Sequence, residues 1–549
     1  MHLKIEEHDI TQTTSFGTAY LRDDPAATSF FHYSPYEHAS YEQSAADLKE
    51  RTFERKRLAE VIRDYLAAYR LTPAIKRHLI QLEEENSVVV LGGQQAGLLS
   101  GPLYTMYKAI TILQLAKQQE EKLGIPVIPI FWIAGEDHDL QEVNHVYVPR
   151  KQGIRMDKLT VDDPSEAQKW SMADRPLPKS EIEHWLTLFF DAQPETEFTN
   201  EIKGTLFALL EQSDTYVDFF ARIMHDCFGE FGLLMVQSAD RRLRQLETAG
   251  FLRVLDHYDD IDRLVRQSIK QMAAKGFPPQ VQVGDHPALL FIYENKERLL
   301  LEKIGADQFR TKDGRLTYSL AELREMAATC PERLSNNVIT RPFMQESLFP
   351  TLAFVGGPGE IAYWALYKTY FEHLGLKLPV LVPRISMTLV EKPIAKVLKR
   401  YHISPRDVFS DFQRFRREWL AEQDELQLQQ TFDKTKEKIT SVYQPLLAKV
   451  NQVDQGMFKL GQKNLGKIIE QVEYLEKRAI AAYESKHAAA LRQFDKVEQM
   501  LIPEQSLQER IYNPYVFLNK HGPELVRHLL ETPFSLNGKH KLIYLHAKD

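Results

Sequence analysis

The sequence predicts an α/β protein whose core is a doubly wound parallel sheet, and three observations support this. Residues 88–91 and 126–133 are short apolar runs, as the buried strands of a parallel sheet are. Residues 103–118, between them, carry apolar side chains at helical spacing. Such a β-α-β unit is right-handed in nearly all proteins and brings the carboxyl ends of both strands to one edge of the sheet. A Rossmann-like sheet is therefore expected.

Further strand signals extend this sheet. They lie at residues 232–237, 288–293, 351–355 and 378–382. The intervals at about 150–230 and 240–330 are longer than one crossover helix. We interpret them as two connecting insertions that project over the edge of the sheet and contribute substrate contacts.

The pattern of residues changes from residue 391, where the strand signals end. Residues 391–505 contain three glycines and four prolines. Apolar residues at alternating spacings of three and four form the seam of a coiled coil, at Leu465, Ile468, Val472, Leu475, Ala479 and Ala482. We interpret this region as an antiparallel helical hairpin with its bend within residues 455–466. A rigid spacer or dimerisation rod and a direct role in catalysis or nucleic-acid binding are both open interpretations.

The expected organisation has four parts. They are a helical N-terminal segment packing on the core (1–85), a Rossmann-like catalytic core with the two insertions (86–390), a helical coiled-coil domain (391–505) and a C-terminal segment returning to the core (506–549).

The composition argues against several classes of protein. The 549 residues carry a formal net charge of −7, so no global cationic field attracts nucleic acid or an anionic membrane. The N-terminal residues lack the apolar centre of a signal peptide, and no uncharged run reaches the roughly 20 residues that a membrane span needs. The two cysteines lack the paired spacing of a zinc site. A cytoplasmic protein that binds no membrane is expected, with nucleic acid an improbable partner.

The first candidate site is the turn GGQQAGLLSGP at residues 92–102. Its glycines allow close approach of the backbone to a ligand, and Pro102 suits the first turn of a helix. Free N–H groups at that helix start would then face an anion. The turn matches neither a Walker loop nor the dinucleotide spacing, and a merely tight connection is the alternative. The candidate binding residues are Gln94, Gln95, Gly97, Ser100, Gly101 and Tyr104.

The second candidate site is the polar segment after residues 126–133. It holds Glu136, Asp137, His138, Asp139, Asn144 and His145. A histidine flanked by acids is expected to have a raised pKa, which suits proton transfer near neutrality. A metal cluster and a structural helix cap are the alternatives. Because neighbouring parallel strands lie about 4.8 Å apart, we expect this segment and the glycine turn to share one cleft.

The third candidate site lies around the later strands, with Arg341 and Gln345 before residues 351–355 and the others at or after the ends of the last two strands. It comprises Arg341, Gln345, Gly356, Gly357, Glu360 and Tyr363, and then Arg384 and Ser386. Glu360 suits an amine or a ribose hydroxyl, and Arg384 offers a guanidinium for a carboxylate or phosphate. Arg341 could instead form an ion pair at the sheet edge.

These motifs resemble a known family. The segments GGQQAGLLSGPLYTMYKAI, PVIPIFWIAGEDHDLQEVNHVYV, RPFMQESLFPTLAFVGGPGEIAYWALYK and LPVLVPRISMTLVEKPI are similar to those of the bacillithiol-biosynthesis cysteine-adding enzymes of Firmicutes. The resemblance extends to QERIYNPYVFLNKHG and covers nearly the whole chain. It implies a core like that of class I nucleotidyl-transferases, with two insertions and a coiled coil that makes a homodimer.

The resemblance also implies a reaction, the formation of an amide between cysteine and glucosaminyl-malate. Carboxylate activation would use ATP, with Mg as an accompanying ion. The backbone at residues 97–101 and Arg384 would then face the phosphate, His138 or His145 would deprotonate the attacking ammonium, and Asp137 and Glu360 would orient the two amines. Residues 94–97 and 385–388 lack the histidines and lysines of the synthetase signatures. Alternatives are a nucleotide-binding scaffold and an RNA-dependent aminoacyl transferase, each with a coiled-coil dimerisation arm.

Overall fold

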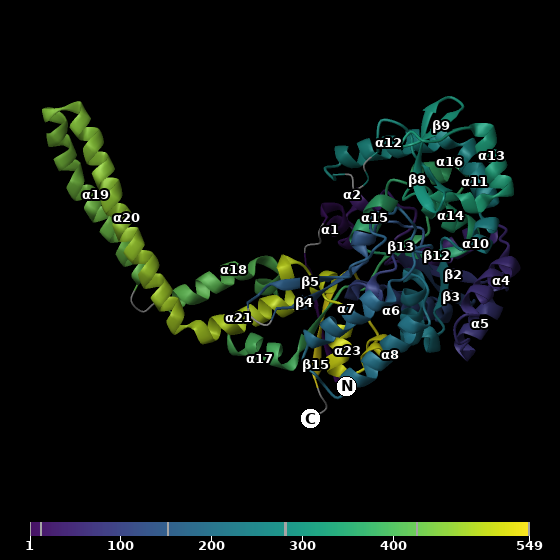
Figure 1. Ribbon diagram of the computed structural model, residues 1–549, viewed down its shortest axis with the longest axis horizontal. Coiled ribbons are helices and arrows are strands. Elements are labelled where there is room, and N and C mark those ends of the chain that lie inside the picture. The colour runs from purple at the N-terminus through teal and green to yellow at the C-terminus, as the bar shows by residue number, and fades with distance from the viewer. Residues whose placement is uncertain are drawn as a thin grey trace. The chain divides into compact units, whose positions relative to one another are not determined.

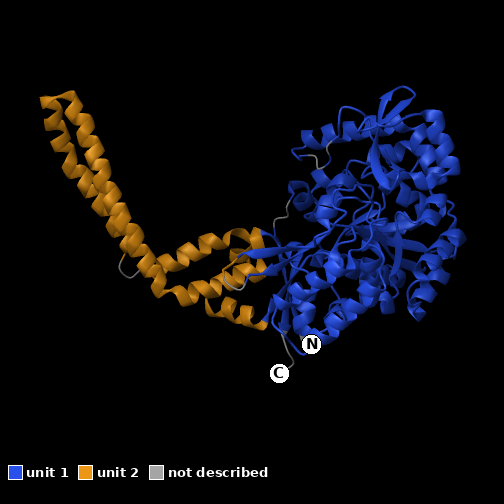
Figure 2. Ribbon diagram, viewed as in Figure 1, with its two compact units in different colours: residues 1–151, 155–391, 506–549 blue, residues 152–154, 392–505 orange. Residues whose placement is uncertain are grey.

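A computed structural model describes residues 2–10, 14–150, 153–278, 281, 283–423 and 427–546 (Figure 1). The chain forms two compact units (Figure 2). The core unit comprises residues 1–151, 155–391 and 506–549, and the helical unit comprises residues 152–154 and 392–505. Within the described residues, every helix is too short or too polar to cross a membrane.

A five-stranded parallel sheet forms the centre of the core unit. Its order is β13-β12-β2-β3-β6, with β2 at Val88–Gln94, β3 at Val127–Ile133, β6 at Leu234–Gln237, β12 at Thr351–Gly356 and β13 at Val380–Pro383. Chain order runs outward from β2 in both directions, which is the doubly wound Rossmann-like arrangement. The predicted fold class is confirmed, and five of the six predicted strand segments form β2, β3, β6, β12 and β13.

Helices cover this sheet. The long α6 (Leu103–Leu123) connects β2 to β3 and packs on β2, β3 and β12. It ends at Gly124, whose left-handed conformation (φ 65°) closes the last turn. The remaining N-terminal helices are α1 (Ser15–Leu21), α2 (Pro25–Thr28), α3 (His38–Lys49), α4 (Arg55–Leu66) and α5 (Pro73–Leu82). Of these, α3 packs on β12 and α4 packs on β6. Helix α5 packs on both β3 and β6.

Two insertions interrupt the sheet. The first holds the antiparallel pair β4 (His145–Pro149) and β5 (Met156–Thr160), with α7 (Lys179–Asp191), α8 (Thr199–Glu211) and α9 (Tyr216–Phe228). The second holds α10 (Arg241–Leu246), α11 (Thr248–Asp256), α12 (Tyr258–Ala274), β7 (Leu290–Glu294), β8 (Glu297–Gly305), β9 (Gln308–Thr311), β10 (Thr317–Ser319), α13 (Leu320–Thr329), β11 (Leu334–Asn336) and α14 (Thr340–Leu348). Its strands form a separate antiparallel sheet, so the predicted strand at residues 288–293 is real but lies outside the central sheet.

A third sheet joins the two ends of the chain. Its order is β1-β15-β14, with β1 at His2–His8, β14 at Met387–Glu391 and β15 at His540–His546. The first strand therefore lies within the segment that we expected to be helical. Between β12 and β13 lie α15 (Pro358–Trp364) and α16 (Lys368–His373), and the C-terminal segment adds α22 (Gln508–Ile511), α23 (Tyr515–His521) and α24 (Glu524–Glu531).

The helical unit contains the predicted antiparallel hairpin. Its helices are α17 (Lys392–Arg400), α18 (Pro405–Glu422), α19 (Leu428–Val453), α20 (Gln455–Lys486) and α21 (Ala488–Leu501). The chain reverses at Asp454, whose carboxylate accepts a hydrogen bond from the Gly456 N–H and caps α20. The predicted bend at residues 455–466 is wrong, because those residues are helical. Gly461 lies where a Cβ would be 2.4 Å from Leu447 Cδ2, so this glycine permits close helix packing rather than a turn.

We predict that Gly93→Ala destabilises the core unit. A Cβ at this position would lie 2.5 Å from the carbonyl oxygen of Trp132 on the neighbouring strand, and backbone cannot move aside cheaply. The expected loss in the free energy of unfolding is about 1–3 kcal/mol. Gly204→Ala is the matched control, because its Cβ would meet open space within a helix and should stabilise by about 0.5–1 kcal/mol. Denaturant unfolding measures both, and equal stability of the two variants would contradict the close contact.

Candidate active site

The candidate active site lies where the strand order of the central sheet reverses. Because β2 and β12 are neighbours whose crossover helices leave in opposite directions, a crevice opens at their carboxyl ends. The strand β2 ends at Gln94, and β12 ends at Gly356. All three predicted motifs follow strands that end at this edge.

Two adjoining cavities occupy this edge, and together we call them the sheet-edge cleft. The first has a volume of about 530 Å³ and the second about 380 Å³. They share five lining residues, which are Gln94, Gln95, Tyr104, Glu142 and Arg510. Every lining residue belongs to the core unit. The combined cleft is large enough for two small substrates.

Most of the predicted site residues line this cleft. The first cavity is lined by Gln94, Gln95, Tyr104, Asp137, Arg341, Gln345, Gly357, Glu360, Tyr363 and Arg384. The second cavity adds Gly97, Gly101 and His145. The glycine turn and the acidic segment also meet directly, since Gln95 Nε2 donates to Asp137 Oδ2 at 2.7 Å and to Glu142 Oε2 at 2.5 Å.

Six predicted residues do not line the cleft. They are Ser100, His138, Asp139, Asn144, Gly356 and Ser386. Ser100 and Asn144 are buried, and the ring of His138 packs edge-on against Phe291. Ser386 Oγ is 2.8 Å from His540 Nδ1 in the third sheet. The signals in the sequence were a position at or after a strand end and, for His138, the acids beside it, and neither determines where a side chain points.

The glycine turn is held by the C-terminal segment. Asn513 Nδ2 donates to the carbonyl oxygens of Leu99 and Gly101, at 2.9 and 2.8 Å. Leu99, Ser100 and Gly101 all have positive φ, so the turn needs such support. The Leu103 N–H donates to the Tyr512 carbonyl at 2.8 Å. This corrects the expectation that all the first amides of α6 are free for an anion.

Sequence reasoning missed Lys108, which is buried behind the first cavity. Its ammonium donates to the Gly93 carbonyl at 2.6 Å, to Gln94 Oε1 at 3.2 Å and to Glu360 Oε2 at 2.5 Å. Burial lowers the pKa of Lys108, and Glu360 opposes this effect. The sequence does place a lysine on the apolar face of the predicted helix. This position could have revealed Lys108, because a buried charge requires a partner.

A buried ion cluster lies beneath the acidic segment. Glu136 is fully buried and accepts from Arg244, and it accepts from Arg341 Nε at 3.2 Å. Burial alone would raise the pKa of Glu136, but Arg244, Arg341 and Arg298 lower it below its usual value. Arg341 thus forms the sheet-edge ion pair that was its alternative interpretation, while still lining the cleft. Arg244 and Arg298 come from the second insertion, and no strand-end pattern marks them.

Asp137 presents its charge to the cleft. Burial would raise its pKa, but Arg298, with Nη1 3.8 Å from Asp137 Oδ1, and the hydrogen bond from Gln95 lower it. Asp137 is therefore ionised at neutral pH and can attract an ammonium group.

The two histidines behave differently from expectation. Burial lowers the pKa of His138, and Arg298 lowers it further, against the smaller opposing effects of Asp137 and Asp139. The expected raised pKa is therefore wrong, because the acids beside His138 in sequence are outweighed by burial and by an arginine distant in sequence. Burial also lowers the pKa of His145. At neutral pH, His145 in the second cavity is an uncharged imidazole that can accept a proton.

Arg384 and Arg510 also line the cleft and supply positive charge there. Arg384 Nη2 contacts Glu509 Oε1 at 2.6 Å, and its guanidinium lies 5.4 Å from the centre of the Tyr104 ring. Arg510 is exposed and forms no ion pair with the described residues. A Cβ at Gly357 would lie 3.7 Å from Arg384 Nε and 3.4 Å from Glu360 Oε2, so the Gly357 backbone lies beside both charged groups.

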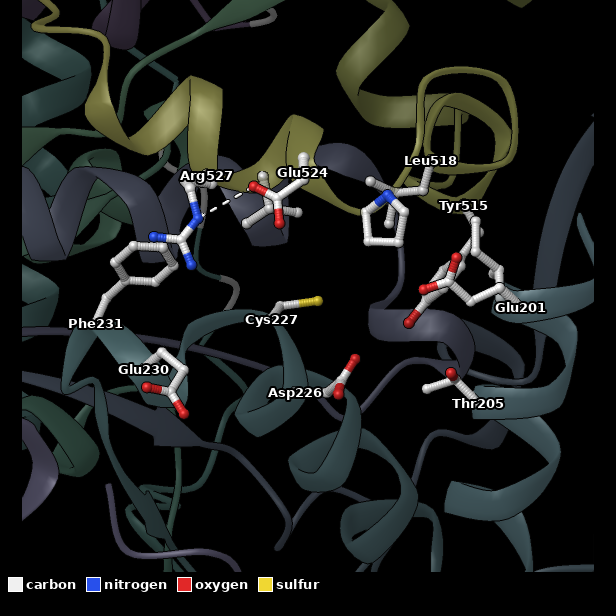
Figure 3. A pocket seen from close by; sticks show the side chains of 13 residues that line it. Glu201, Thr205, Asp226, Cys227, Glu230, Phe231, Tyr515, Leu518, Glu524 and Arg527 are labelled. Atoms are coloured by element: carbon white, nitrogen blue, oxygen red, sulfur yellow. Dashed lines mark ion pairs between the residues drawn. The ribbon is translucent and has the colours of Figure 1, made fainter. Parts of the chain in front are cut away.

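A separate cavity of about 160 Å³ near the amino end of β6 has the wrong charge for this chemistry (Figure 3). Four acids line it, namely Glu201, Asp226, Glu230 and Glu524. Its one arginine, Arg527, pairs with Glu524 at 3.2 Å. Burial raises the pKa of the Cys227 thiol, so the thiol stays protonated and is a poor nucleophile. This cavity repels carboxylates and phosphates, which the sheet-edge cleft can attract.

No metal centre forms from the acidic segment. Within the described ranges, the ligand atoms of Glu136, Asp137, His138, Asp139 and His145 do not provide three within 4.8 Å of one another. The metal-cluster alternative for this segment therefore has no geometric support.

We predict a pH-dependent effect of Glu247→Gln on stability. Burial raises the pKa of Glu247 to about 7, although Arg244 Nη1 contacts its carboxylate at 2.6 Å. Between the unfolded pKa near 4.5 and this value, the folded chain keeps a proton that the unfolded chain has lost, so stability falls as pH rises. The variant should lack this fall, gaining about 1–3 kcal/mol relative to the natural chain between pH 5 and 7.5.

Denaturant unfolding at several pH values measures this difference. The same change at exposed Glu183 provides the baseline for a glutamine substitution. A difference between Glu247→Gln and the natural chain that stays constant with pH would contradict the raised pKa.

Comparisons with known proteins agree with this architecture. The family model described as "Bacillithiol biosynthesis BshC, N-terminal Rossmann-like domain" matches residues 3–385, and that of the BshC C-terminal coiled-coil domain matches residues 387–545. A relative from Geobacillus sp. (strain WCH70), named "Putative cysteine ligase BshC", is 38% identical over 99% of this chain and 100% of its own length. A relative of the same name from Bacillus thuringiensis (strain Al Hakam) is 37% identical over 96% of this chain and 97% of its own. The chain belongs to the BshC family of bacillithiol biosynthesis.

Proposed function

We propose that this chain is a cysteine-adding ligase that joins the carboxylate of cysteine to the amine of glucosaminyl-malate at the sheet-edge cleft. Two findings support the proposal. Relatives of nearly equal length carry the name of a cysteine ligase. The cleft also places groups of both charges within one pair of adjoining cavities, as a reaction between a carboxylate and an amine requires.

The charge distribution of the cleft carries the proposal. Arg341, Arg384 and Arg510 line the first cavity and suit carboxylate or phosphate groups. Asp137 and Glu360 line the same cavity and suit ammonium groups. Lys108 and the Gly357 N–H both contact Glu360 Oε2, which leaves Oε1 for a substrate amine.

His145 is the base that we assign to the amine. An ammonium ion must lose a proton before its nitrogen can attack a carbonyl carbon. The lowered pKa of His145 keeps its ring neutral at physiological pH, so the ring can take that proton as the C–N bond forms. His138 shares the lowered pKa but does not line the cleft, which favours His145.

ATP is the cofactor that we propose, with Mg as its accompanying ion. When bound, ATP would turn the carboxylate oxygen into a leaving group. The glycines at 97 and 101 line the second cavity without side chains, and the exposed Arg510 borders both cavities. These residues would hold phosphate oxygens, and Arg384 would offset negative charge that develops at the carboxylate.

The decisive experiment supplies the purified chain with cysteine, glucosaminyl-malate and ATP. The formation of bacillithiol is followed together with AMP and ADP, which identifies how the nucleotide is used. Asp137→Asn should lower kcat/KM by about tenfold or more, because an ionised group that faces the substrate amine is lost.

Asp162→Asn is the matched control, since Asp162 is an exposed acid outside the cleft. It should retain full activity. Absence of product from the natural chain would refute the reaction, whereas full activity of Asp137→Asn would refute the assignment of the cleft.

We also propose that the chain forms a homodimer through the coiled coil and acts in the cytoplasm. Both cysteines are free thiols, as a reducing compartment favours. The α19–α20 hairpin leaves large apolar side chains exposed, including Val442, Leu446, Val453, Leu460 and Leu475. An isologous dimer that uses the same surface on both chains would cover them.

Replacing Val472 and Leu475 with Asp should therefore give monomers, because two charges would have to be desolvated in the contact. Light scattering measures the mass. Lys459→Asp with Lys477→Asp changes two exposed positions of α20 that lie off the helical face of Leu460 and Leu475, and it should leave the dimer intact. An unchanged dimer in the first variant would contradict the assigned surface.

A further inference from the structure

A group of metal-ligating side chains lies in the core unit outside the sheet-edge cleft. His257 and Asp260 flank the start of α12, three positions apart, and His373 is the last residue of α16. These helices pack against each other, and Ser268 Oγ and Thr369 Oγ1 are 3.0 Å apart at their contact. The packing of α12 on α16 therefore brings residues that are more than a hundred positions apart to one point.

The three side chains converge. His373 Nε2 lies 3.5 Å from Asp260 Oδ2, and the rings of His257 and His373 have their centres 5.3 Å apart at an angle of 81°. One ligand atom from each residue lies within 4.8 Å of the other two. Ligand atoms around a tetrahedral zinc ion, with bonds of about 2.0–2.1 Å, are separated by roughly 3.3 Å. Small side-chain rotations would bring all three to that separation.

The carboxylate also has the support that metal ligands receive. Arg263 Nη2 donates to Asp260 Oδ1 at 2.6 Å, which leaves Oδ2 on the side of His373. Carboxylates that bind metals are commonly fixed by such an outer hydrogen bond. An ion pair between Asp260 and a protonated His373 accounts for two of the residues only. It does not account for the second imidazole, which would add a like charge if it were protonated.

We propose that His257, Asp260 and His373 bind one divalent transition-metal ion, with Zn²⁺ as the representative ion. Two imidazoles and one carboxylate are a donor set that borderline ions such as Zn²⁺ favour over Mg²⁺ or Ca²⁺. Three protein ligands leave the remaining coordination positions to water. The bound ion would join the second insertion to α16, which follows the helix that carries Glu360 and Tyr363 in the cleft.

Metal binding to the full chain tests this site. After treatment with EDTA, the protein is titrated with Zn²⁺ by calorimetry and with Co²⁺ by visible absorption, which reports the number and type of ligands. We expect one equivalent to bind, and we expect Zn²⁺ to raise the midpoint of thermal unfolding because it binds only the folded chain.

Variants separate this site from adventitious binding. His257→Ala, His373→Ala and Asp260→Asn should each weaken the one-equivalent binding by more than about tenfold, and Arg263→Gln by about tenfold. Asp259→Asn is the matched control, since this neighbouring acid pairs with Lys303 and should leave binding unchanged. Circular dichroism verifies that each variant folds.

The proposal would be overturned by either of two results. One is the absence of Zn²⁺ and Co²⁺ binding in the natural chain. The other is binding of several equivalents whose affinity is the same in the natural chain and in all the folded variants, which would indicate adventitious surface binding only.

Discussion

The buried carboxylate of Glu136 is the interaction on which the cleft depends. It lies three residues after the end of β3 and is fully buried, and it contacts Arg244 and Arg341. Removing one such partner from a buried carboxylate typically lowers the free energy of unfolding by about 3–5 kcal/mol. The arginines belong to the second insertion, so this requirement fixes the insertion on the sheet. Asp137, the next residue, is thereby held near Arg298 and stays ionised at the cleft.

Support for the cleft also comes from the end of the chain. Glu509 holds Arg384, and Asn513 holds the carbonyl oxygens of the glycine turn. Lys108 crosses beneath the point where the strand order reverses and joins α6 to Glu360. Each of these contacts satisfies a buried charge or a strained turn. The residues with chemical roles can therefore face the cavity, because other residues pair with the buried charges and hold the strained turn in place.

The local pattern of residues was sufficient to predict the strands of the central sheet and part of the site. Apolar runs located β2, β3, β6, β12 and β13, because buried parallel strands need continuous apolar side chains. The local pattern was insufficient to predict β1. Its sequence, HLKIEEH, mixes charged and apolar residues and forms a strand by pairing with β15. The hairpin bend was placed within residues 455–466, whereas the chain reverses at Asp454, which caps α20, and Gly461 lies within that helix at its contact with Leu447.

The sequence by itself determined the fold class, the family and the strand ends at which polar residues gather, since these follow from periodicity and from motifs contiguous in the chain. Only the tertiary structure decided which of those residues share a cavity and what charge each carries. His138 and His145 show the reason. Both neighbour acids or polar residues in sequence, yet burial and distant cations lower their pKa values, and only His145 lines the cleft. Burial and electrostatics depend on distances in space, which the spacing of residues along the chain does not contain.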